Sequence, residues 1–155
     1  MGKALTFKDN IIIDLPDGFQ RMTEDDFKEK NFLTRPEYIF TNKENVYIIL
    51  EAKERKKRNF PENLKKTYAV IKRITPGFKG LGIAKKTIND IEVGALQYKS
   101  NTVTDELYNI MMICHVKDTQ LMVSGHCLWG DYGKWKPLFF EMIETIREDS
   151  KKQGI

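Results

Sequence analysis

The fold is decided by the stretch LYNIMMICHVKDTQLMVSGHCLW, residues 107–129. Every second position is apolar or glycine, even-numbered in the first half and odd-numbered in the second: Tyr108, Ile110, Met112, Cys114, Val116, Leu121, Val123, Gly125, Cys127 and Trp129. A period of two is typical of β-strands that bury one face. The polar turn predicted at 117–120 has an even number of residues, so both apolar sets lie on one face of a hairpin.

A helix is predicted directly after this hairpin. Apolar residues recur there at spacings of three and four: Trp135, Leu138, Phe139, Met142, Ile143 and Ile146. Such a stripe needs a sheet to cover it. The other hairpin face is also too apolar for open water, since it carries Asn109, Met111, Ile113, His115, Met122 and Leu128. We expect a second helix to cover that face; an uncovered patch there would be an interface.

The rest of the chain contains pairs of predicted strands joined by short turns, at 5–7 with 11–15, 38–40 with 46–52, and 81–88 with 91–100. A short helix is expected over 24–31, after Thr23. Another begins at Phe60, with Asn59 as a possible cap, and its apolar side is predicted to hold Leu64, Thr67, Tyr68, Val70, Ile71 and Ile74. Short turns join antiparallel neighbours, so we expect one α+β domain over residues 1–155, a mainly antiparallel sheet flanked by helices.

The composition is that of an ordinary soluble domain, with 41% hydrophobic and 31% charged residues in 155. No apolar run approaches the roughly 20 residues that span a bilayer, and residues 1–7 do not resemble a signal peptide. A cytoplasmic location is therefore expected unless a leader peptide has been removed. Cys114 and Cys127 share a hairpin face about four residues out of register, which predicts free, buried thiols.

Basic residues are concentrated between Lys53 and Lys86. This segment has a net charge of +10, against +4 for the whole chain. The candidate partner-binding residues in it are Arg55, Lys56, Lys57, Arg58, Lys65, Lys66, Lys72 and Arg73. Such a patch can attract nucleic acid, an anionic membrane or an acidic protein. It lacks the interleaved aromatic residues of a single-strand stacking platform, and a solvated helix face with a charged loop accounts for it without any function.

Two aromatic residues are a further candidate for partner binding. Trp129 and Tyr132 lie at the predicted corner between the hairpin and the last helix. An exposed aromatic side chain at such a corner can be a binding hot spot. Packing into the core is the alternative, and we expect Trp135 to be buried in this way.

No catalytic, cofactor-binding or metal-binding residue is predicted. The pairs Cys114-His115 and His126-Cys127 contain metal-ligating residue types, but neighbours on a strand point to opposite faces and cannot chelate one ion. The glycine-rich segment 77–82 lacks the phosphate-binding patterns, and Ser124-Gly125-His126 lacks the strand-to-helix turn of a nucleophile elbow. We therefore expect a protein that is not an enzyme, with a small enzyme of dispersed site as the least favoured alternative.

The segment Ile11-Ile12-Ile13-Asp14-Leu15-Pro16-Asp17-Gly18-Phe19 precedes a short acidic helix, and Arg35-Pro36-Glu37-Tyr38-Ile39-Phe40 then opens a strand. With the strand at 107–113 and the closing helix at 135–138, this arrangement resembles the PsbP-like superfamily, and in particular its small bacterial members. The resemblance spans nearly the whole chain and implies an α/β/α sandwich. It also implies binding to other proteins, since the superfamily includes the PsbP subunit of photosystem II, Ran-binding Mog proteins, DcrB lipoproteins and Eag-type chaperones.

The leading functional hypothesis is accordingly a non-enzymatic protein-binding, adaptor or chaperone-like domain. The alternative is an electrostatic binder of nucleic acid or anionic membrane that uses the basic segment 53–86. The sequence leaves open the identity of the partner and the oligomeric state.

Overall fold

The computed structural model describes residues 2–25, 38–56 and 59–149. Seven strands form one sheet in the order β3-β4-β5-β9-β8-β7-β6, and three form a smaller sheet in the order β1-β2-β10. All the paired strands are antiparallel. The strands are β1 (Ala4–Thr6), β2 (Ile11–Asp14), β3 (Gln20–Arg21), β4 (Tyr38–Thr41), β5 (Tyr47–Glu54), β6 (Lys79–Ile88), β7 (Ile91–Asn101), β8 (Glu106–Val116), β9 (Thr119–Leu128) and β10 (Arg147–Glu148).

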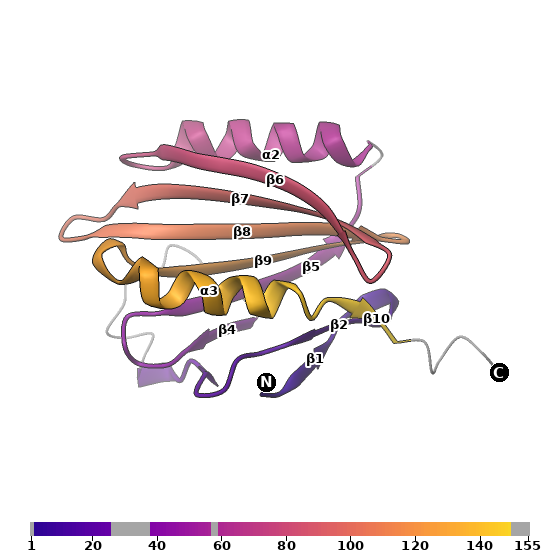
Figure 1. Cartoon of the computed structure of the whole chain (residues 1–155), viewed down its shortest axis with the longest axis horizontal. Helices are drawn as coiled ribbons and strands as arrows, with labels where there is room; N and C mark the ends of the chain where they lie inside the picture. The colour runs from indigo at the N-terminus through magenta and orange to yellow at the C-terminus, as the bar shows by residue number, and fades with distance from the viewer. Residues whose placement is uncertain (1, 26–37, 57–58, 150–155) are drawn as a thin grey trace.

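The described helices are α2 (Phe60–Ile74) and α3 (Tyr132–Ile143), with short 3-10 turns η1 (Lys8–Asn10) and η2 (Trp129–Asp131). In Figure 1, α3 runs across the seven-stranded sheet near β9 and β5, and α2 lies beside β6 at the opposite side of the molecule. Two separate apolar clusters hold these helices on the sheet. The chain thus has the predicted α+β architecture, an antiparallel sheet with helices on both faces.

The central hairpin is confirmed. Strands β8 and β9 pair with Met112 opposite Val123 and Cys114 opposite Leu121, a register that differs by two residues from the predicted one. The turn is two residues long rather than four, which keeps the number even and both apolar sets on one face. Cys127 lies opposite Tyr108, so the two cysteines are six residues out of register rather than four, and both thiols are free and buried. Trp129 leaves the strand and begins η2.

The face of the sheet toward α3 carries the main core. Phe139, Met142 and Ile143 of α3 are buried there among the alternating residues of β8 and β9. Gly125 allows this close approach, because a Cβ at that position would lie 2.7 Å from the Phe139 ring. The predicted apolar stripe extends to Ile146, which is fully buried, but the helix ends at Ile143.

The opposite face of the sheet is covered in part by α2. The predicted cap is confirmed, since Asn59 Oδ1 accepts a hydrogen bond from the Glu62 backbone N–H at 2.8 Å. Buried residues of the helix pack on β7 and β8 in a second cluster: Phe60, Leu64, Ile71, Leu96, Tyr98 and Ile113. Two residues predicted on the buried side are exposed, Val70 at 43% and Ile74 at 67%, because they lie at the margin of the helix–sheet contact.

The prediction of one sheet was wrong in one respect. The N-terminal hairpin β1–β2 forms, but it pairs with β10 in a separate sheet instead of joining the large one. Strands β3 and β10, two residues each, were not predicted. The helix expected over 24–31 lies almost entirely outside the described residues. Strand β6 forms one edge of the large sheet and contains a bulge between Gly80 and Gly82.

Candidate functional site

A pocket of about 320 Å³ lies between α2 and the strands β5, β8 and β9; we call it the α2 groove. Four apolar residues form its floor and one wall: Val70, Ile71, Met111 and Met122. The helix contributes positions 63, 66, 67, 70 and 71, which share one face of an α-helix because they are spaced by three and four. The groove is therefore the seam where one side of α2 meets the sheet.

The strand residues of the groove come together through the register of the sheet. Lys53 on β5 lies opposite Gln120 on β9, and Met122 on β9 lies opposite Ile113 on β8. Residues two apart on a strand share a face, so Gln120 and Met122 both point toward α2. The pairing of β9 with its neighbouring strands thus brings Lys53, Gln120 and Met122 to the same side of the sheet, next to α2.

An amide network forms the polar end of the groove. Asn63 Nδ2 donates to Gln120 Oε1 at 2.7 Å, and His115 Nε2 lies 2.9 Å from the same oxygen. The Phe60 ring packs edge-on against the imidazole, with ring centroids 5.1 Å apart. Burial lowers the pKa of His115, an effect that the hydrogen bond to Gln120 opposes in part. The network is therefore uncharged at neutral pH, and it fixes the orientation of both amides.

Three lysines line the rim of the groove. Within the described ranges, the ion pairs of Lys53 and Lys66 are solvent-exposed, to Glu51 at 3.9 Å and to Glu62 at 3.6 Å. Lys56 has no ion-pair partner among the residues that the structure describes. Exposed pairs of this kind are weak, so the rim presents positive charge to a ligand.

The basic residues singled out in the sequence are divided by the fold. Lys56 and Lys66 line the groove, whereas Lys65, Lys72 and Arg73 lie on exposed positions of α2 outside it. Arg55 is turned toward the β8–β9 turn, where its Nη1 donates to the Lys117 carbonyl at 3.3 Å. Lys57 and Arg58 lie outside the described residues.

The groove residues that the sequence analysis did not propose as a site are Lys53, Asn63, Thr67, Val70, Ile71, Met111, Gln120 and Met122. A signal for two of them was present, because Met111 and Met122 lie on the outer hairpin face that was too apolar for open water. The amides gave no signal, since Asn63 and Gln120 are far apart in the sequence.

The aromatic corner is packed mainly against itself. The Tyr132 ring stacks on Tyr108 with centroids 5.5 Å apart and lies 5.1 Å from Trp129. The Lys99 ammonium lies 4.7 Å from the Trp129 ring centroid, and Tyr108 donates to Gln97 Oε1 at 2.7 Å. Tyr132 remains 40% exposed, and Trp129 is half-buried. These contacts stabilise the corner and leave one tyrosine edge toward solvent.

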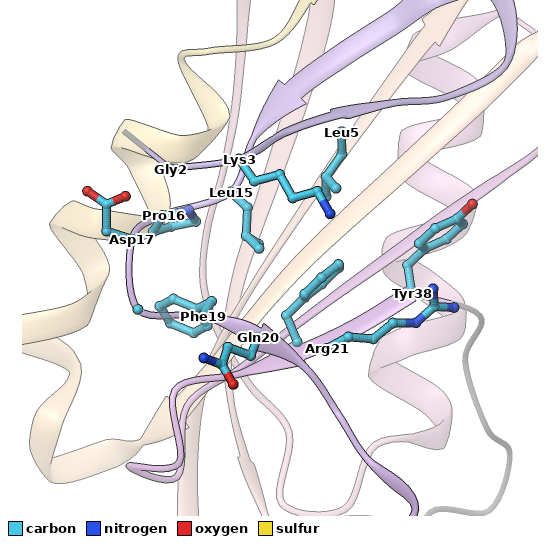
Figure 2. A pocket seen from close by; sticks show the side chains of 12 residues that line it. Gly2, Lys3, Leu5, Leu15, Pro16, Asp17, Phe19, Gln20, Arg21 and Tyr38 are labelled. Atoms are coloured by element: carbon cyan, nitrogen blue, oxygen red, sulfur yellow. The ribbon is translucent and has the colours of Figure 1, made fainter.

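A second cavity of about 430 Å³ lies where the N-terminal strands approach β3 and β4. Figure 2 shows the Lys3 side chain reaching past Leu5, the Phe19 ring on the opposite side, and Arg21 extending toward Tyr38. The Arg21 guanidinium already lies 5.3 Å from the Tyr38 ring centroid. Asp17 also lines this cavity, so its charges are mixed, unlike those of the α2 groove.

The cysteines and histidines occupy opposite faces of the central hairpin, as predicted. Cys114 and Cys127 are buried in the α3 core, where burial raises the pKa of each thiol to about 12. His126 lies 2.6 Å from Asn109 Oδ1 and 3.0 Å from Ser124 Oγ, and burial lowers its pKa to about 4. Residues 2–25, 38–56 and 59–149 contain no group of three or more side chains suited to a metal ion.

Within the same described ranges, no helix combines the length and the apolar character needed to cross a membrane. The sequence matches no protein-family model and no curated protein.

Solved structures of similar fold extend over nearly the whole chain. CyanoP, the PsbP protein of Synechocystis sp. PCC 6803, is 8% identical with a TM-score of 0.69, over 95% of this chain and 92% of its own. LpqN of Mycobacterium tuberculosis, involved in cell envelope biogenesis, is 12% identical with a TM-score of 0.68, over 94% of this chain and 88% of its own.

PA94 of Pseudomonas aeruginosa, a protein of unknown function, is 10% identical with a TM-score of 0.61, over 92% of this chain and 94% of its own. Identities this low establish the fold and nothing about the role. The match to CyanoP agrees with the resemblance found in the sequence, and the chain has the PsbP-like fold.

Proposed function

We propose that this chain is a non-enzymatic binding protein that recognises another protein through the α2 groove. The observation that carries the proposal is a concave seam with an apolar floor and a lysine rim. Apolar side chains that remain accessible at the centre of a polar rim are the usual anatomy of a protein-binding surface. Methionine suits such a floor, because its flexible thioether adapts to the shape of a partner.

The chemistry of the groove supports binding over catalysis. Among its described lining residues, the charged side chains are all lysines, and none is a carboxylate, an imidazole or a thiol. Thr67 carries the one hydroxyl among them, and it donates to the Asn63 carbonyl at 2.8 Å within the helix. A general base, which an enzyme would need close to this hydroxyl, is not part of the lining.

The test is a pull-down with the full chain as bait, at low and high salt, followed by identification of the retained protein and titration of that protein in purified form. The groove variant is Lys56→Glu with Lys66→Glu. The matched control is Lys65→Glu with Lys72→Glu, which changes the net charge equally on exposed positions outside the groove. Both variants should keep the melting temperature of the wild type, since all four side chains are exposed.

We expect the same partner to bind the wild type and the control, and to be lost from the groove variant. Retention by both variants would place the partner elsewhere and contradict the proposal. Equal loss from both, with nucleic acid or anionic lipid recovered only at low salt, would favour the electrostatic alternative instead.

A further inference from the structure

The α2 groove contains two largely buried amides, each with one polar atom that has no hydrogen-bond partner among the described residues and is still accessible to solvent. Asn63 and Gln120 are each only 5% exposed, and one hydrogen bond of 2.7 Å joins Asn63 Nδ2 to Gln120 Oε1. Asn63 Oδ1 and Gln120 Nε2 have no hydrogen-bond partner in the described part of the chain. Both residues line the groove, so an acceptor and a donor are held next to each other at its polar end.

An acceptor beside a donor is the complement of a peptide unit, which offers one N–H and one C=O. His115 strengthens this arrangement, because its Nε2 lies 2.9 Å from Gln120 Oε1 and limits rotation of that amide. Partner atoms in a fixed geometry lose little freedom when a ligand arrives. The polar end of the groove is therefore suited to the main chain of a bound segment.

The floor and the rim restrict the side chains of such a segment. Met111 and Met122 are half-buried, and Val70 is 43% exposed, so an apolar side chain entering the groove would cover surface that now meets water. The lysines of the rim favour carboxylates on either side of it. Stacked bases find no platform, because the described lining includes no aromatic residue.

We infer that the α2 groove binds an acidic amphipathic peptide segment of a partner protein. Apolar side chains of the segment cover Met111, Met122 and Val70, and one of its peptide units pairs with Asn63 and Gln120. Its Asp or Glu residues face Lys53, Lys56 and Lys66. This inference rests on the proposed function and adds the chemistry of the partner.

The experiment is a selection from a random 12-residue peptide display library on the immobilised full chain, followed by titration of the selected peptides in fluorescence anisotropy. We expect the selected sequences to be enriched in Asp and Glu around Leu, Ile, Met or Phe. Replacement of their Asp and Glu by Asn and Gln should weaken binding about tenfold or more. A selection without acidic enrichment, or with basic enrichment, would overturn the inference.

A pair of helix variants locates the peptide without disturbing the core. Val70→Asp places a carboxylate in the groove and should weaken binding about tenfold or more, whereas Ala69→Asp, exposed on the same helix and outside the groove, should change it less than about twofold. Equal effects of the two variants would contradict groove binding.

Asn63→Ala tests the peptide unit, and its thermal melt is recorded alongside the titration. Weaker binding by a folded variant is expected. If Asn63→Ala folds and binds as the wild type does, the titration is repeated with Gln120→Met. Unchanged binding by both variants would show that the two amides do not pair with a peptide unit of the ligand.

The two proposals fail in different ways. If the pull-down partner is lost from the Lys56→Glu, Lys66→Glu variant but selected acidic peptides do not compete with it, the α2 groove still binds a protein and only the acidic segment is wrong. If the partner is retained by that variant, the proposed function itself fails.

Discussion

The two faces of the seven-stranded sheet differ in how completely they are buried. Under α3, Met112 and Phe139 have no exposed surface. Under α2, Met111 and Met122 are only half-buried, and Val70 on the helix is 43% exposed. One face is packed as a closed core, whereas the other keeps apolar surface within reach of water.

This difference separates folding from binding. Apolar surface contributes to the free energy of unfolding in proportion to the area that folding removes from water, so the face under α3 supplies most of it. Apolar surface left open contributes when a partner covers it. Exposed residues of the α2 groove, such as Val70, can thus be substituted with little effect on the stability of the fold.

The largest expected effect on stability comes from truncating a buried phenylalanine on each face of the seven-stranded sheet. Phe139→Ala should lower the free energy of unfolding by about 4 kcal/mol, because it empties the middle of the closed core. Phe60→Ala should cost about 3 kcal/mol, at the low end for a buried phenylalanine, since Phe60 packs in the smaller cluster at the start of α2. Urea denaturation of both variants measures these changes in the free energy of unfolding. Equal losses would show that the two faces of the sheet contribute equally to stability.

The pH dependence of stability should come from the polar side chains of the α2 side. Burial lowers the pKa of His126 to about 4, below the value of about 6.5 in an unfolded chain. Between these values only the unfolded state binds the proton, so the contribution is complete above about pH 6.5 and is lost as the pH falls toward 4. For this half-buried ring we expect a loss of about 2 kcal/mol.

The measurement for His126 is urea denaturation between pH 7 and pH 4.5, for the wild type and His126→Gln. The carboxylates titrate in both proteins and cancel in the difference. If the free energy of unfolding of the wild type falls with pH no more steeply than that of His126→Gln, the pKa of His126 is not lowered in the folded state.

The third comparison uses glycines that allow a helix to approach each face. A methyl group at Gly125 would lie 2.7 Å from ring carbons of Phe139, and one at Gly94 would lie 2.7 Å from a terminal methyl of Leu64. A rigid ring in a closed core cannot move away, whereas a leucine terminus can. Gly125→Ala should therefore cost about 1.5 kcal/mol and Gly94→Ala less than about 1 kcal/mol, as measured by thermal unfolding. The reverse order would show that α2 is packed as tightly as α3.

The last prediction concerns the cap of α2, whose effect should be confined to one helix. Asn59→Ala removes the acceptor for the Glu62 N–H and should cost about 1 kcal/mol. Hydrogen exchange should increase in the first turn of α2 and stay unchanged in β8 and β9. Asn59→Asp keeps the acceptor and should restore protection; uniform loss across the sheet would mean that the two faces unfold as one unit.

The sequence predicted the parts of the fold that depend on local patterns. The alternation over 107–129 gave the central hairpin and its inner face, because side-chain direction follows directly from the period of two. The same reasoning placed Cys114 and His115 on opposite faces. Strand β10 was missed, since two residues carry no periodicity and their partner β2 lies at the other end of the chain.

The candidate site could be predicted only in part. The run of lysines was evident along the chain, but which lysines meet depends on how α2 is rotated on the sheet. Val70 was predicted to be buried and instead borders the groove. The contact of Asn63 with Gln120 joins a helix to a strand 57 residues away, and no local pattern signals it.

Strand β6 has a consequence for the protein at high concentration. Its outer edge has no neighbouring strand within the described residues, and Leu81 and Ile83 are 40% and 50% exposed. A flat edge strand with exposed apolar side chains could pair with the same strand of another molecule, and the molecules would aggregate. The bulge between Gly80 and Gly82 interrupts its row of hydrogen-bonding groups, and Lys79 and Lys85 add like charges that repel a second copy. The edge is thereby protected against aggregation.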